Sequence, residues 1–165
     1  MICKKCGREM NDKDLFCPSC GTKQVTIYRQ VFSRSGISER DFIDSINIWF
    51  QNNPRVANVN CRFDMRTSVG MFANKYKLKE VVIEFELLEG INTYQYGITK
   101  ESSTALIAKK ANGLVDKWSQ NHPGAIVVTW SGGRHSRGSS SSLLLGGIGA
   151  CNRMNAYILY KFPRR

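Results

Sequence analysis

The chain has 165 residues, 42% of them hydrophobic, and a net charge of +11 from 24 basic and 13 acidic side chains. This apolar fraction excludes a wholly disordered chain, and no apolar run reaches the roughly 20 residues of a membrane-spanning helix. Residues 101–165 hold nine basic and two acidic side chains, and no carboxylate side chain follows Asp116. The uneven charge predicts an anionic partner, which is a nucleic acid, an acidic protein or a phosphorylated ligand; the alternative is that the excess charge only keeps a small protein soluble.

Residues 1–24 contain two Cys-x-x-Cys pairs with ten residues between them. The four cysteines are Cys3, Cys6, Cys17 and Cys20. Two such turns facing each other give tetrahedral coordination of one Zn²⁺ by four thiolates. Because protein sulfur fills all four positions and leaves none for water or substrate, we expect a structural zinc rather than a catalytic one.

Each pair is followed by a glycine, Gly7 or Gly21, and Phe16 precedes the second pair. The pattern Cys-x-x-Cys-Gly … Phe-Cys-x-x-Cys-Gly resembles the N-terminal zinc-ribbon domains of bacterial proteins, over residues 1–24 only. A redox Cys-x-x-Cys normally occurs once, after a strand, and disulfides require an oxidising compartment. The start MICKKCGR has no apolar signal-peptide core, so we expect a cytoplasmic protein.

Residues 25–165 predict a second, α+β domain. Apolar alternation and turn residues predict strands at 26–32, 58–66, 79–90, 93–99, 125–130 and 155–162. Apolar stripes at helical spacing predict a helix beginning after the cap residue Ser38 and ending before Pro54, and a second at about 103–121.

The two halves of this domain carry similar helix ends. Trp49-Phe-Gln-Asn-Asn-Pro54 and Trp118-Ser-Gln-Asn-His-Pro123 match at four of six positions, at an offset of 69 residues. The order strand–helix–strand–strand also occurs twice, so we predict an internal duplication, with repeat one at about 25–90 and repeat two at about 91–165. The expected fold is a six-stranded, mostly antiparallel sheet with both helices on one face. The matching Trp49 and Trp118 are expected to be core anchors.

Two basic regions are candidates for anion binding. In the Gly/Ser-rich segment 131–150, Arg134, His135 and Arg137 offer donors for phosphate, and Arg153 follows the segment; the alternative is a plain flexible loop, since the segment matches no nucleotide-binding signature. Arg62 and Arg66 share a strand face, but Glu84 and Glu86 on the next strand favour cross-strand ion pairs over a nucleic-acid platform.

The sequence gives little support for an enzymatic function. Cys61 lies on an apolar strand face, which favours an inert buried thiol, and Cys151 has no identifiable base near it in sequence. We therefore predict a non-enzymatic zinc protein that binds an anionic partner, RNA or DNA first. The alternatives are a protein–protein adaptor that docks through the ribbon and, third, an unrecognised enzyme.

Overall fold

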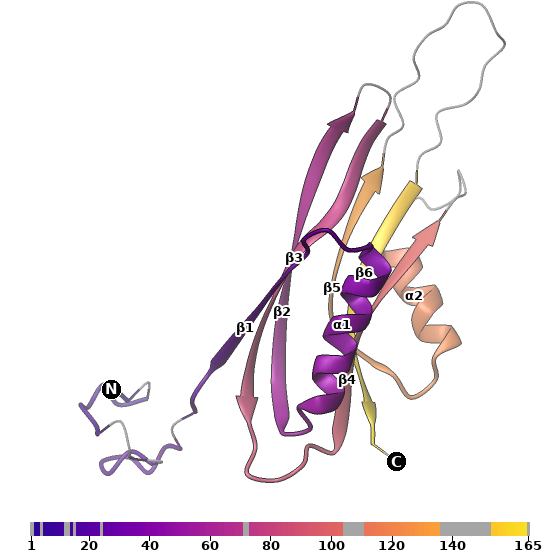
Figure 1. The fold of residues 1–165 in the computed structure, drawn as a ribbon. Coiled ribbons are helices and arrows are strands. Elements are labelled where there is room, and N and C mark those ends of the chain that lie inside the picture. Colours follow the sequence, from indigo (N-terminus) through magenta and orange to yellow (C-terminus); the bar gives the residue numbers. More distant parts are fainter. Residues whose placement is uncertain are drawn as a thin grey trace, which may run out of the picture.

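A small cysteine-rich segment precedes two strand–helix–strand–strand units (Figure 1). The computed structural model describes residues 2–3, 5–11, 14, 16–23, 25–70, 73–103, 111–135 and 153–164, with backbone alone at 67–70, 73–76, 134, 135 and 153. The first unit comprises β1 (Tyr28–Ser33), α1 (Glu39–Asn52), β2 (Val56–Gly70) and β3 (Ala73–Leu87). The second comprises β4 (Tyr94–Ser103), α2 (Ala111–Asn121), β5 (Ile126–His135) and β6 (Arg153–Pro163). The predicted elements and their order are confirmed, with every strand except β1 longer than predicted; residues 104–110, predicted as helix, lie outside the described residues.

Helix α1 begins as the sequence predicts. The Ser38 hydroxyl accepts a hydrogen bond from the Asp41 backbone N–H at 3.1 Å, which satisfies one of the free donors of the first turn. The apolar stripe of α1 is buried through Phe42, Ile43, Ile46 and Phe50.

The six strands form two sheets rather than one. Each is three-stranded and antiparallel, with orders β1-β3-β2 and β4-β6-β5. The prediction of one six-stranded sheet with both helices on one face is therefore wrong. In each unit the last strand is central, flanked by the first and the second strand.

The burial of strand β6 shows why the prediction of a single sheet with both helices on one face is wrong. Ala156, Tyr157, Ile158 and Leu159 are all 0% exposed, so β6 is covered on both faces. Ala156 and Ile158 pack against Val115 and Trp118 of α2, whereas Tyr157 and Leu159 join the core of the first unit, with α1, β2 and β3. The second sheet thus lies between α2 and the first unit, and the two helices lie on opposite faces of it. The unbroken apolar run in β6 is typical of a strand buried on both faces.

The two units share their strand register. Tyr28 of β1 pairs with Phe85 of β3, and Gly97 of β4 pairs with Tyr160 of β6. Gly97 follows Tyr28 by 69 residues in the first strands of the two units, and Tyr160 follows Phe85 by 75 residues in the last strands. Strands β2 and β5 each have a register shift at the corresponding place, between Ala57 and Asn60 and between Val127 and Thr129.

Each helix packs a tryptophan against an aromatic residue of its own central strand. The ring centroids are 5.4 Å apart for Trp49 and Phe85 and 4.9 Å apart for Trp118 and Tyr160. Trp118 is 4% exposed, and Trp49 packs against the main core. The prediction that both are core anchors is confirmed.

The helix ends also match, although not through the residues that share sequence. The Asn53 amide donates to the Trp49 carbonyl oxygen at 2.8 Å, and Nδ1 of His122 bonds the Trp118 carbonyl oxygen at 2.8 Å. The capping side chains, Asn53 and His122, therefore stand at one of the two positions at which the sequence motifs differ.

Candidate metal centre

The cysteine-rich segment consists of two similar turns. Gly7 and Gly21 adopt φ of 71° and 64°, a left-handed conformation that glycine adopts without steric cost. Their N–H groups donate to the carbonyl oxygens of Cys3 and Cys17 at 2.9 and 2.8 Å. Short antiparallel bridges, Ile2 with Glu9 and Phe16 with Lys23, close the turns.

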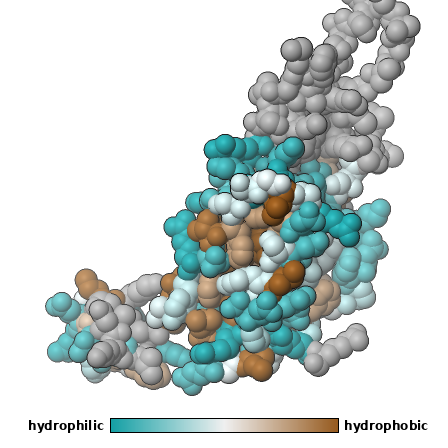
Figure 2. Space-filling view, viewed as in Figure 1, coloured by the Kyte–Doolittle hydropathy of each residue, from teal (hydrophilic) through white to brown (hydrophobic). Residues whose placement is uncertain are grey.

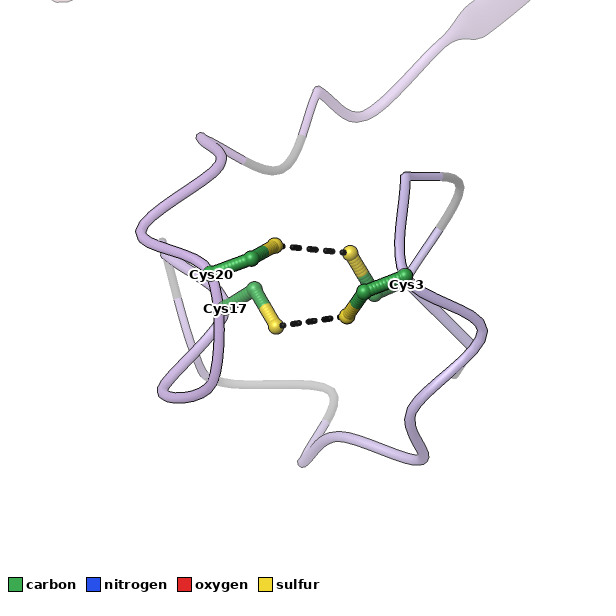
Figure 3. Close-up of side chains that lie close together, drawn as sticks. Cys3, Cys17 and Cys20 are labelled. Atoms are coloured by element: carbon green, nitrogen blue, oxygen red, sulfur yellow. Dashed lines mark hydrogen bonds between the residues drawn. The ribbon is translucent and has the colours of Figure 1, made fainter.

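The turns bring four sulfur atoms together. Figure 3 shows the side chains of Cys17 and Cys20 pointing toward that of Cys3 across the space between the turns. The sulfurs are 3.6 Å apart for Cys3 and Cys20 and 3.5 Å apart for Cys6 and Cys17, and all four lie within 4.8 Å of one another. A tetrahedral ion with Zn–S bonds of about 2.3 Å requires sulfurs about 3.8 Å apart, so the four cysteines are positioned to bind one zinc ion.

Local hydrogen bonds favour the thiolate forms of Cys3 and Cys20. At Cys6 the backbone N–H of Arg8 lowers the pKa, but the Cys17 and Cys20 thiols outweigh it and raise the pKa to about 12. The backbone N–H groups of Cys6 and Lys5 lower the pKa of the Cys3 thiol. The Thr22 hydroxyl and backbone N–H lower the pKa of Cys20 to about 6. Cys3 and Cys17 are each 1% exposed and pack with Met10, which shields one side of the sulfur cluster from water.

The predicted anion-binding residues lie only partly within the described chain. Arg134 and His135 end β5, where they pair with Met154 and Arg153 of β6. The backbone register thus brings His135 and Arg153 together across an antiparallel ladder. Arg137 and the rest of the Gly/Ser-rich segment from residue 136 to 150 lie outside the described residues, as does Cys151.

Cys61 is a buried thiol, as the strand pattern predicts. It is 8% exposed, and burial raises its pKa to about 12. A thiol held protonated in this way is a poor nucleophile.

A half-buried charged cluster between the two units was not predicted. The Glu39 carboxylate in the first turn of α1 accepts hydrogen bonds from Lys100 of β4, from the Tyr157 hydroxyl of β6 and, at 3.0 Å, from the Leu78 backbone N–H of β3. It lines a cavity of about 510 Å³ between α1 and β4. The only sequence signal was an acidic residue directly after the cap, which normally indicates helix-dipole stabilisation alone.

Among the described residues, no helix is long and apolar enough to cross a bilayer. Neither the curated proteins nor the solved structures contain a match to the chain. Residues 2–24 match the family of zinc-ribbon domains, the segment that holds all four clustered cysteines. The N-terminus of this chain is therefore a zinc ribbon with four cysteines positioned for one zinc ion.

Proposed function

We propose that the chain is a non-enzymatic, cytoplasmic nucleic-acid-binding protein whose basic C-terminal half contacts RNA or DNA. The observation that carries the proposal is the end of the β5–β6 hairpin. There Arg134 and His135 adjoin Arg153 across the ladder, and Arg137 follows in sequence. No Asp or Glu occurs between Asp116 and the end of the sequence, so the charge of this hairpin is uncompensated along the chain.

The rest of the molecule supports binding rather than chemistry. The ribbon's four thiolates complete a zinc coordination shell, and the Cys61 thiol is buried. Zinc held by reduced cysteines fits a reducing compartment such as the cytoplasm. On the face seen in Figure 2, hydrophilic side chains predominate and the apolar ones are scattered.

The test is the affinity of the full chain for a fluorescent oligonucleotide, with Arg134→Gln/Arg137→Gln as the variant. Arg40→Gln/Lys117→Gln is the matched control, because it removes the same charge from exposed positions on α1 and α2. We expect the first variant to bind several-fold more weakly and the control to bind almost as the wild type. Equal weakening by both variants would mean that only net charge matters and would contradict the proposed site.

A protein-adaptor function is the second candidate, and one observation favours it. Ile2 and Phe16 occupy equivalent positions in the two zinc turns and are 68% and 56% exposed. Paired exposed apolar side chains on a rigid turn suit a protein contact. If this function is correct, Ile2→Ser/Phe16→Ser abolishes retention of a protein partner at moderate salt while zinc binding persists; unchanged retention would exclude the ribbon as the docking element.

We also infer that the body arose by internal duplication. The shared register, the corresponding register shifts, the paired tryptophans and the paired helix caps support it. Exchange of the caps, Asn53→His with His122→Asn, tests this equivalence. We expect cooperative unfolding with little change in midpoint, whereas loss of cooperative unfolding would contradict equivalence of the two helix ends.

A further inference from the structure

The β2–β3 hairpin continues well beyond the strand that flanks it. Strand β1 pairs with β3 only from Phe85 to Glu80. Strands β2 and β3 go on pairing with each other from Met65 and Leu78 to Gly70 and Ala73. Beyond Glu80 the sheet therefore narrows to a two-stranded ribbon that projects from the body (Figure 1).

Every charged residue of this projecting ribbon is basic. Residues 65–79 contain no Asp or Glu and four basic residues, which are Arg66, Lys75, Lys77 and Lys79. The nearest carboxylates on the paired strands, Asp64 and Glu80, are register partners of each other and mark the boundary with the body. The ribbon thus extends a purely basic segment away from the acidic residues of the sheet.

Arg66 and Lys77 stand directly opposite each other across the ladder, and both are exposed. Like charges at opposed positions of an antiparallel pair are destabilising. The predicted cross-strand ion pairs of Arg62 and Arg66 with Glu84 and Glu86 are not found among the described residues, where the ion pairs are Arg40–Asp44 and Glu39–Lys100. Glu86 instead accepts a hydrogen bond from Asn58 at 2.8 Å. The basic pair is therefore left for an outside anion.

The composition and shape of this surface indicate which class of nucleic acid it binds. No aromatic side chain lies with Arg62, Arg66 and Lys77 on the described part of the outer face of the β1-β3-β2 sheet, which carries polar residues with Val31 and Val82. Single-strand binding relies on aromatic stacking, whereas duplex binding relies on contacts to phosphate. The major groove of B-form DNA admits a two-stranded ribbon, but the narrow major groove of an A-form RNA helix does not.

Building on the proposed function, we propose that the projecting β2–β3 ribbon binds double-stranded DNA, with Arg66 and Lys77 contacting backbone phosphates. The β5–β6 hairpin of the proposed function lies close to this ribbon in the fold, since β5 packs against both β2 and β3.

The experiment compares the full chain with the variant Arg66→Gln/Lys77→Gln on three fluorescent probes of one sequence: duplex DNA, single-stranded DNA and duplex RNA. We expect the wild type to bind duplex DNA most tightly. The variant should bind it several-fold more weakly, with a salt slope shallower by about two, because two phosphate contacts are lost. The control Arg40→Gln/Lys117→Gln should keep the wild-type slope.

Each other outcome overturns a defined part of the account. Tighter binding of single-stranded DNA or duplex RNA excludes duplex DNA as the partner. If Arg66→Gln/Lys77→Gln binds as tightly as the wild type while Arg134→Gln/Arg137→Gln binds weakly, the β2–β3 ribbon is excluded as a DNA contact but the proposed function remains in place. No retention of any probe by the wild type at low salt overturns both, and retention of an acidic protein instead would favour the adaptor. Thermal unfolding midpoints of both variants, expected to be within about 2 °C of wild type for surface changes, show that the loss is not misfolding.

Discussion

The hydroxyl of Tyr157 on β6 donates a hydrogen bond to the carboxylate of Glu39 in the first turn of α1. This contact joins the second unit to the first across 118 residues of sequence. Lys100 donates to the other carboxylate oxygen of Glu39. Because Tyr157 is 0% exposed, the contact lies inside the interface between the units, and it fixes how the second sheet sits on α1.

Loss of the Glu39 charge is expected to destabilise the body. Glu39→Gln leaves Lys100, whose side chain is 28% exposed, without its counter-ion, and we expect a loss of about 1–3 kcal/mol in the free energy of unfolding. Asp44→Asn is the control on the same helix, since its pair with Arg40 spans 3.9 Å between side chains that are 60% and 90% exposed; it should change stability by less than about 0.5 kcal/mol. Urea unfolding followed by tryptophan fluorescence measures both, and equal effects would contradict the account.

Stability should depend on pH through the same residue. Burial alone would raise the pKa of Glu39, but hydrogen bonds from Lys100, Tyr157 and the Leu78 N–H outweigh it and hold the pKa below its ordinary value of 4.5. A carboxyl whose pKa is lower in the folded state binds its proton more readily when unfolded, so its contribution is complete above about pH 4.5 and is lost as the pH falls through the folded-state pKa. The stability difference between wild type and Glu39→Gln should therefore be constant from pH 7 to pH 5 and shrink below that. A difference that grows on acidification would refute the assignment.

Gly97 is required by the ring of Tyr160. A Cβ atom at residue 97 would lie 2.6 Å from the Tyr160 hydroxyl oxygen and 2.7 Å from Cζ. Gly97→Ala should therefore cost about 1–3 kcal/mol of stability. Gly113→Ala is the matched control: it lies in α2 with no atom within 4 Å of the new Cβ, so it should raise stability by about 0.5–1 kcal/mol. Thermal or urea unfolding of the two variants should give opposite signs, and a neutral Gly97→Ala would show that the ring moves freely.

Removal of zinc should unfold the ribbon and leave the body intact. The buried apolar cluster of the zinc ribbon consists of Cys3, Met10 and Cys17, with Cys20 packed against it. This apolar surface is too small to hold the fold without the metal. Metal analysis should find one zinc per chain in the wild type and in Cys61→Ala, and none in Cys17→Ser. Amide NMR signals from residues 2–23 should collapse on chelation while those of α1 and β6 persist. Collapse of the body signals as well would show that the ribbon is part of the core.

The sequence predicted the local features of the molecule better than their assembly. The zinc turns, the Ser38 cap and the strand faces follow from spacing and periodicity, which act over a few residues. The sheet arrangement depends on β6, whose continuous apolar run indicates burial on both faces but not which elements cover them. Glu39, Lys100 and Tyr157 come from distant segments, and no local pattern connects them.

The most direct test of the central claim is the affinity of the wild-type protein for a short DNA duplex between about 50 and 200 mM salt. We expect measurable binding at low salt, with the logarithm of the association constant falling linearly and steeply as the logarithm of salt concentration rises. No binding at the lowest salt, or an affinity that does not change with salt, would contradict it.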